Sequence, residues 1–231
     1  STVDALPAQE RERILLQARA YNELLAGESA ELPADQVAPY EEQLIFDRDP
    51  MMSWVEIPSI NVSMPIYHGT GEEALMAGVG HLEGTSLPVG GESSHCVLTA
   101  HSGMRNLSMF DDIHALEEGD LVLLHTMNQT LAYRVTGSEV VWPDEIESLV
   151  IEPGTDKLTL VTCTPYGVND HRLLVHCDRT EYVEQEAADQ KSLLARHWGK
   201  REIAVLIVVA AMALVLLDIV VHRLRRRRGD G

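Results

Sequence analysis

Apolar residues in the first part of the chain recur at helical spacing. Positions three and four residues apart form one apolar face, made of Ile14, Leu15, Ala18, Tyr21, Leu24 and Leu25. Gly27 stands where such a helix would end, because glycine readily adopts the left-handed conformation that terminates helices. We therefore predict an amphipathic helix within residues 1–27 that packs on the rest of the domain or on a partner.

Residues 28–52 have no hydrophobic period and are rich in proline and acidic residues. This pattern predicts a loop of more than about fifteen residues, a length at which loops in compact domains tend to be lids, binding segments or disordered. The segment is therefore a candidate lid.

From Trp54 onward the hydrophobic period changes to two. Strand candidates follow the first alternating run at 96–100, 121–126, 130–136, 138–142, 157–163 and 172–177. Short helices are expected at 72–77 and 107–115. Turn signals such as Gly90-Gly91 separate the strands, and no strand–helix–strand rhythm is present. Many short strands of this kind predict a mainly β domain over residues 53–182, folded as a closed or nearly closed barrel.

The last part of the chain carries an apolar run followed by a basic cluster. Between Ile203 and Val221 the only charged residue is Asp218. As a helix, this run would be about 28 Å long, close to the thickness of the hydrocarbon core of a bilayer. A buried core helix is the alternative, but such a helix rarely lacks a polar face. We predict a transmembrane helix over residues 203–222.

The basic cluster sets the orientation of that helix. Residues 223–231 contain five arginines and predict a cytoplasmic tail, because positively charged segments stay on the cytoplasmic side of a membrane. Residues 183–202 would form a juxtamembrane linker or helix, and the domain before them would lie outside the cell. The sequence begins with Ser1 rather than Met, so we expect that an export signal or a first membrane span has been removed.

The formal net charge of −18 argues against a nucleic-acid binder, since phosphate contacts require a basic face. The histidines at positions 68, 81, 95 and 114 are scattered without metal-ligand spacing. No metal ion and no other cofactor is therefore expected.

The stretch from Leu158 to Arg172 holds the densest group of reactive side chains. Apolar and polar residues alternate up to Cys163, a loop follows, and His171-Arg172 opens the next strand candidate. A cysteine at the end of one strand and an arginine nine residues later can lie side by side across an antiparallel pair. The cation would then favour the reactive thiolate or stabilise charge on a substrate. A buried structural cysteine is the alternative interpretation of Cys163.

A second strand candidate ends in a histidine. Val97-Leu98-Thr99 leads into Ala100-His101, and a cysteine nucleophile needs such a proton partner. His101 is one of ten histidines, so spacing alone does not select it.

Three segments resemble the active-site motifs of sortases. They are Leu98-Thr99-Ala100-His101-Ser102-Gly103, Thr159-Leu160-Val161-Thr162-Cys163-Thr164-Pro165 and His171-Arg172-Leu173-Leu174-Val175. Ile57-Pro58-Ser59-Ile60 and Gly78-Val79-Gly80-His81 are similar to early strands of the same family. The resemblance covers about residues 54–180. Residues 78–91 and the C-terminal apolar run are most similar to class C, the pilin-polymerising sortases.

The resemblance implies an eight-stranded sortase barrel and a thiol transpeptidase mechanism. Cys163 would attack the Thr–Gly bond of an LPXTG-like sorting signal to form a thioester, and His101 would pass protons to the leaving amine and from the incoming one. Arg172 would hold the substrate or the oxyanion. Substrate binding is expected of the neighbouring residues Ala100, Thr162 and Thr164.

Class C membership would make pilins the partners, with a pilin lysine as the amine acceptor and a covalent pilus on a Gram-positive surface as the product. The nearest alternative is an anchoring sortase that transfers surface proteins to the cross-bridge of peptidoglycan. A cysteine protease is a further alternative, although its cysteine usually comes early and on a helix. A membrane-tethered scaffold, in which Cys163 is incidental, is the alternative without catalysis.

Two features depart from the class C pattern. Its lid usually carries an Asp-Pro-aromatic motif, whereas Asp49-Pro50 is followed by Met51, and Asp35, Pro39 and Tyr40 are candidate lid residues without that motif. The family barrel would also place Cys96 and Cys177 on either side of the Cys163 strand. That separation exceeds the reach of a disulfide, so both are expected to be free thiols.

Overall fold

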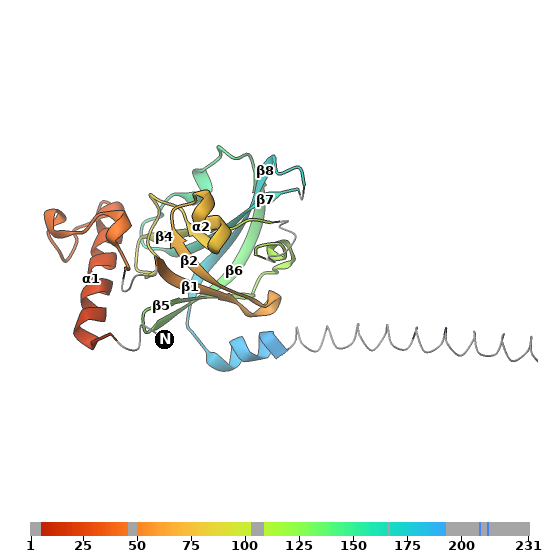
Figure 1. The fold of residues 1–231 in the computed structure, drawn as a ribbon, viewed down its shortest axis with the longest axis horizontal. Coiled ribbons are helices and arrows are strands. Elements are labelled where there is room, and N and C mark those ends of the chain that lie inside the picture. The colour runs from red at the N-terminus through yellow and green to blue at the C-terminus, as the bar shows by residue number, and fades with distance from the viewer. Residues whose placement is uncertain are drawn as a thin grey trace, which may run out of the picture.

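The computed structural model describes residues 6–45, 50–102, 109–165 and 167–192, together with Val208 and Met212. The predicted N-terminal helix is α1 (Ala8–Leu25), which stands against one side of a β-barrel (Figure 1). Its apolar face is buried at Ile14, Leu15 and Ala18. The chain leaves the helix through Gly27, whose φ of 75° lies in the left-handed region.

Eight strands close into the predicted barrel, in the spatial order β1-β2-β3-β4-β7-β8-β6-β5. They are β1 (Met51–Ile57), β2 (Val62–His68), β3 (Val79–His81), β4 (Ser94–Thr99), β5 (Leu121–Thr126), β6 (Gln129–Val141), β7 (Asp156–Thr164) and β8 (His171–Thr180). The β2–β3 and β4–β7 pairs are parallel, and the other pairs are antiparallel. Because the barrel is closed, each of the eight strands pairs with a neighbour on both sides and the sheet has no edge strand.

The short helix predicted at 72–77 is confirmed as α2 (Glu72–Ala77). The two strands predicted at 130–136 and 138–142 form one strand, β6, because the ladder with β8 continues through a bulge between Val135 and Gly137. Short 3-10 turns lie at Ala34–Gln36, Tyr40–Glu42, Pro58–Ile60, Ile113–Ala115 and Glu147–Leu149.

The helix predicted over 107–115 is wrong for the part that the structure describes. Residues 109–112 form bends and a turn, and only Ile113–Ala115 forms a single 3-10 turn. The N–H of Phe110 donates to the carbonyl of His101 at 3.2 Å, a partner outside the segment. Met109, Phe110 and Ile113 are all buried in the core, so tertiary packing overrides the local helical pattern.

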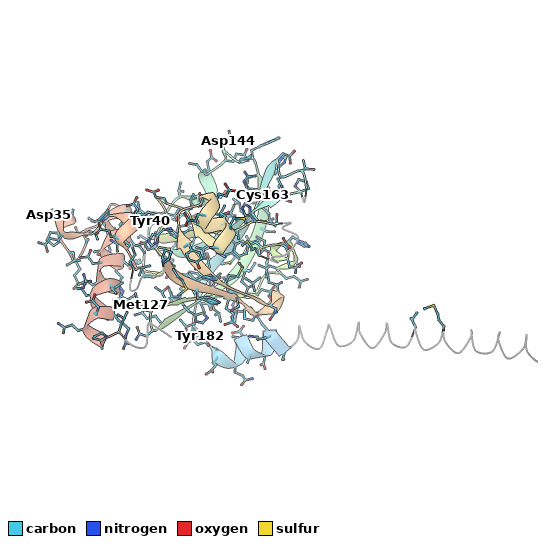
Figure 2. The ribbon with its side chains drawn as sticks, viewed as in Figure 1. Asp35, Tyr40, Met127, Asp144, Cys163 and Tyr182 are labelled. Atoms are coloured by element: carbon cyan, nitrogen blue, oxygen red, sulfur yellow. The ribbon has the colours of Figure 1, made fainter. Side chains whose placement is uncertain are left out.

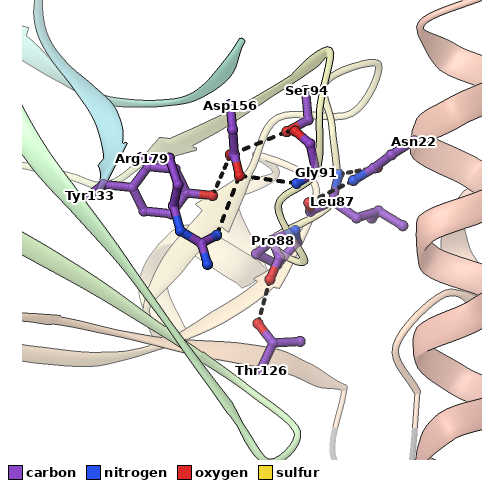
Figure 3. A network of polar contacts seen from close by, with 9 residues as sticks. All are labelled: Asn22, Leu87, Pro88, Gly91, Ser94, Thr126, Tyr133, Asp156 and Arg179. Carbon is purple, nitrogen blue, oxygen red and sulfur yellow. Dashed lines mark hydrogen bonds and ion pairs between the residues drawn. The ribbon is translucent and has the colours of Figure 1, made fainter. Parts of the chain in front are cut away.

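A polar cluster closes the end of the barrel where β7 begins (Figure 3). The carboxylate of Asp156 accepts hydrogen bonds from Tyr133 Oη at 2.8 Å, Gly91 N at 3.0 Å and Arg179 Nη1 at 3.3 Å. Ser94 Oγ donates to the same carboxylate at 3.3 Å. These bonds join β4, β6, β7 and β8 with the turn at residues 88–91.

The loop before β4 is also tied to α1. The side-chain amide of Asn22 donates to the Leu87 carbonyl at 3.1 Å and its oxygen accepts from the Leu87 N–H at 2.7 Å (Figure 3). Asn22 is buried, so this reciprocal pair satisfies polar groups that would otherwise lack partners.

After β8 the chain forms a helix from residue 184 to residue 192 that packs on the outside of β5 and β6. Arg134 of β6 binds the Glu186 carboxylate with both of its terminal nitrogens, at 2.8 and 3.1 Å. Ala187 packs against Leu121, Leu123 and Ala132 in a small cluster separate from the barrel core.

Among the residues that the structure describes, no helix is long and apolar enough to cross a bilayer. The helix predicted at 203–222 lies outside these residues, apart from Val208 and Met212.

Candidate active site

Cys163 and Arg172 lie side by side at one end of the barrel. They are direct partners in the antiparallel ladder between β7 and β8, so the placement predicted from their spacing is confirmed. The Cys163 side of β7 faces outward and is half-buried, whereas Leu158 and Leu160 face the core. The Cys163 carbonyl accepts a hydrogen bond from Ser102 Oγ at 2.9 Å. This bond ties the end of β7 to the segment that follows β4.

His101 reaches the same end because β4 and β7 are parallel neighbours. Thr99 pairs with Val161, and the N–H of Ala100 donates to the Val161 carbonyl at 3.2 Å. The carboxyl ends of parallel strands lie at the same edge of a sheet, so the residue after Ala100 arrives beside the residues after Val161. His101 and Cys163 are 62 positions apart in the sequence and meet through this pairing.

His101, Cys163 and Arg172 line one cavity of about 360 Å³. Its floor is apolar and is formed by the outward side chains of Val97, Val161 and Leu174. The segment between β6 and β7 forms one wall, with Trp142, Pro143, Glu145, Ile146 and Leu149. Asp144, which belongs to this segment, and Cys163 both lie in the upper part of the molecule in Figure 2. The cavity is thus an apolar groove with one thiol, one imidazole and one guanidinium.

The Arg172 guanidinium is held by main-chain carbonyls. Its Nη1 donates to the His171 carbonyl at 2.9 Å and to the Asn169 carbonyl at 3.2 Å. Among the described residues, no carboxylate forms an ion pair with Arg172. Its positive charge is therefore available to negative charge on a bound substrate.

The aromatic ring of Trp142 stacks on the imidazole ring of His171, with the two ring centroids 4.1 Å apart. His171 Nδ1 lies 2.8 Å from Asp170 Oδ1. The pair joins the β6–β7 segment to the start of β8, beside Arg172. Trp142 is 53% exposed and belongs to the barrel rim.

Of the three residues expected to bind substrate, only Ala100 lines the cavity. Thr162 is buried, and its hydroxyl donates to the Ala100 carbonyl at 2.9 Å, which joins β7 to β4 from the inside. Thr164 pairs with His171 at the last position of the ladder and does not line the cavity. The structure therefore assigns Thr162 to the framework beneath Cys163.

None of the candidate lid residues lines the cavity. Asp35 is exposed, and Asp35 and Tyr40 lie on the side of the molecule that carries α1, away from Cys163 (Figure 2). Pro39 precedes the 3-10 turn that begins at Tyr40. Asp49 of the sequence Asp49-Pro50 lies outside the described residues, and a lid formed by residues 28–52 stays a prediction.

Tyr40 instead fastens its segment to the barrel. Its hydroxyl lies 2.9 Å from His81 Nδ1 and accepts the Gly69 N–H at 2.9 Å. His81 Nε2 lies 2.9 Å from the Ser86 carbonyl, which can only accept, so His81 carries its proton on Nε2. Burial lowers the pKa of His81 to about 4 and raises the pKa of Tyr40. Both side chains therefore stay neutral at physiological pH.

Cys96 and Cys177 are free and buried, as expected. Both pair with Leu158, Cys96 from β4 and Cys177 from β8, so one whole strand separates them. Two strand spacings amount to about 9.5 Å, too far for a disulfide. Burial raises the pKa of both thiols, which keeps them protonated and unreactive.

The groove wall from Trp142 to Leu149 was missed in the sequence. Its signal was a set of apolar residues at 142, 146, 149 and 150 within an otherwise acidic loop. Among the described residues, no group of three histidine, cysteine or acidic side chains is arranged to hold a metal ion.

The fold and the site together define an enzyme class in which a strand-borne cysteine works with a histidine and an arginine at one end of a β-barrel. The family model for the sortase domain matches residues 55–180. The chain belongs to the sortase family, whose members are cysteine transpeptidases.

Solved structures of class C sortases are similar over most of the chain. Sortase C-1 from Actinomyces oris is 46% identical, with a TM-score of 0.66, and the match covers 74% of this chain and 99% of that one. A sortase C from Streptococcus pneumoniae, whose structure was described in terms of catalysis and pilin substrate specificity, is 39% identical with a TM-score of 0.70. That match covers 78% of this chain and 93% of the other.

Sortase A of Streptococcus agalactiae serotype III is 28% identical over 149 residues, which is 63% of this chain and 60% of that protein. The chain thus spans about three fifths of the length of the curated relatives it matches.

Proposed function

We propose that this protein is a pilin-polymerising transpeptidase that cleaves an LPXTG-like sorting signal and transfers it to a pilin lysine. The observation that carries the proposal is the meeting of Cys163, His101 and Arg172 in one groove. An extended peptide fits such a groove, with its apolar side chains on the floor and its scissile bond beside the thiol.

The reaction would proceed in two balanced halves. The Cys163 thiolate attacks the threonine carbonyl carbon, the C–N bond to glycine breaks, and His101 gives its proton to the departing amine. The product is a thioester between Cys163 and the threonine. The lysine amine then attacks this thioester, His101 takes up the amine proton, and the Cys163 thiolate leaves. Arg172 stabilises the negative oxygen of each tetrahedral intermediate.

Similarity to class C sortases favours a pilin lysine as the acceptor. The match to sortase A supports the alternative acceptor, an amine of the peptidoglycan cross-bridge. Both acceptors use the same first half-reaction, so they differ only in the amine that reaches the thioester.

The proposed setting is the cell membrane. The apolar run 203–222 would anchor the chain in the bilayer, the arginine-rich tail would lie in the cytoplasm, and the barrel would lie outside the cell. Pilins delivered to the outer face of the membrane would then reach the groove.

The test mixes the chain with an LPXTG-like peptide and follows the intact mass. We expect an adduct of the peptide up to its threonine on the wild-type chain and on a Cys177→Ala control, and none on Cys163→Ala. Adding candidate pilins should produce a ladder of covalent oligomers, whereas transfer only to short cross-bridge amines would favour anchoring. Absence of a Cys163 adduct with every sorting peptide would refute the proposal.

A further inference from the structure

A chain of hydrogen bonds crosses the outside of the barrel next to the groove. His95 Nδ1 lies 3.0 Å from the Val150 carbonyl, and His95 Nε2 lies 2.8 Å from Thr159 Oγ1. The same hydroxyl lies 3.1 Å from His176 Nδ1, and His176 Nε2 lies 3.0 Å from Glu139 Oε1. Four strands are joined in this way, since the side chains come from β4, β7, β8 and β6.

All four contacts can be hydrogen bonds at the same time only if the two imidazoles together carry one proton more than in their neutral forms. The Val150 carbonyl accepts from His95 Nδ1, and the Glu139 carboxylate accepts from His176 Nε2. Thr159 has a single hydroxyl hydrogen, so it can donate to one imidazole and must accept from the other. The imidazole that donates to Thr159 then carries hydrogen on both nitrogens and is a cation. With both imidazoles neutral, one of the four contacts is lost.

The surroundings place this proton on His176. His95 is buried, and burial lowers its pKa. Lys157, the partner of His95 in the β4–β7 ladder, adds positive charge there, although Glu152 binds its ammonium group at 2.7 Å. His176 is 28% exposed and faces the Glu139 carboxylate. Thr159 therefore donates to His95 and accepts from His176.

Both ends of the chain of contacts hold the wall of the groove. His95 binds the Val150 carbonyl, which follows the 3-10 turn Glu147–Leu149. Glu139, which contacts His176, is also near that turn, because the Ser148 side chain and then His176 lower the pKa of its carboxyl. Ile146 and Leu149, on either side of Ser148, line the cavity that contains Cys163. The position of this wall therefore depends on the two imidazoles.

We propose that His95, Thr159 and His176 are positioning residues that hold the β6–β7 wall of the groove in a proton-dependent way. The four contacts that hold the wall can form together only when the two imidazoles share the extra proton, so the wall loosens when rising pH removes it. An effect on peptide binding rests on the proposed function, whereas the effect on the wall itself does not.

The first test measures amide hydrogen exchange of the full chain over residues 142–150 at pH 6 and pH 8, corrected for the intrinsic rates. We expect protection to fall about fivefold between these pH values, the factor that one net hydrogen bond contributes. Thr159→Val, which cannot link the imidazoles, should exchange fast at both pH values, and Thr159→Ser should restore the wild-type behaviour. His125→Gln is the matched control, because His125 also lies between a threonine and a glutamate, 3.1 Å from Thr130 and 3.4 Å from Glu56, on β5.

The second test measures cleavage of an LPXTG-like peptide. Thr159→Val should raise KM about fivefold with kcat within about twofold, because the wall binds the substrate without taking part in the chemistry. The wild-type KM should rise with pH over the same range, and the KM of His176→Gln should not.

Protection that is equal at pH 6 and pH 8 in the wild type would overturn the inference, as would a Thr159→Val variant that exchanges like Thr159→Ser. If the wild type cleaves no sorting peptide, the proposed function fails, and the exchange experiment still decides this inference by itself.

Discussion

Removing the Asp156 carboxylate should destabilise the barrel at the end far from Cys163. The carboxylate accepts four hydrogen bonds, and its side chain is 15% exposed. In Asp156→Ala, the Gly91 N–H and the Arg179 guanidinium can turn to water, because both lie in exposed contacts. The Tyr133 hydroxyl cannot, because Tyr133 is fully buried.

The expected loss of stability depends on which of these partners can bind water instead. An unsatisfied buried hydroxyl costs about 1–3 kcal/mol, and the lost charge-assisted bonds of the exposed partners add about 1 kcal/mol after rehydration. We expect the free energy of unfolding to fall by about 3 kcal/mol, or the melting temperature by about 6–12 °C for a chain of this size. Tyr133→Phe, which removes only the donor, should cost about 1 kcal/mol.

The assay is urea unfolding of the full chain followed by circular dichroism. Asp178→Ala is the matched control, since Asp178 is an exposed aspartate that pairs across the β7–β8 ladder with Lys157, the residue next to Asp156, and its loss should cost less than about 0.5 kcal/mol. A double-mutant cycle with Tyr133→Phe should reveal coupling between the two residues. A loss below about 1 kcal/mol in Asp156→Ala, equal to that of the control, would refute the assignment of Asp156 as the hub.

Three further perturbations have defined outcomes. Burial lowers the pKa of His81 in the folded chain to about 4. As pH falls, His81 therefore takes up a proton in the unfolded chain before it does so in the folded chain. The stability contributed by neutral His81 is therefore complete above about pH 6.5 and is lost as pH falls toward 4, by about 3 kcal/mol. Urea midpoints should show a steeper acid decline in the wild type than in His81→Gln, and equal slopes would contradict this. Gly90→Ala should lower the melting temperature by several degrees, because φ is +64° and the new Cβ would lie 2.7 Å from Arg179 Nη1; an unchanged melting temperature would contradict this. Arg172→Lys should reduce kcat/KM for a sorting peptide about a hundredfold, because an ammonium group lacks the planar pair of donors of a guanidinium group, and it should leave the melting temperature unchanged. A change in kcat/KM below about twofold would exclude Arg172 from oxyanion binding.

The parts of the site that were predictable depend on local spacing. Cys163 and Arg172 are joined by a single turn between antiparallel strands, so nine residues of sequence suffice to place them as partners. His101 reaches Cys163 only through the parallel pairing of β4 with β7, a contact between distant segments. No local pattern encodes that pairing, and the choice of His101 among ten histidines came from the resemblance to sortases.

The parts that failed depend on tertiary contacts. The apolar residues at 109, 110 and 113 suggested a helix, but all three belong to the main hydrophobic core, and only Ile113 lies in a 3-10 turn. The wall at 142–149 lacks any hydrophobic period, because loop residues held by individual hydrogen bonds need none. Thr162, one of the residues expected to bind substrate, points inward because alternation along β7 places its side chain on the opposite face from that of Cys163, and its hydroxyl donates to the Ala100 carbonyl there.

Strand β8 separates the groove from the helix at 184–192. β8 runs from His171, beside Arg172 in the groove, to Thr180 near the start of that helix, about 30 Å at the rise of an extended chain. The bidentate ion pair between Arg134 and Glu186 joins the start of that helix to β6. With residues 203–222 in a bilayer as proposed, the thiol would lie at the end of β8 that is farther along the chain from the membrane anchor. A substrate that is itself anchored would then need a spacer long enough to reach that end of the barrel, so the length between its sorting signal and its anchor becomes a selection criterion.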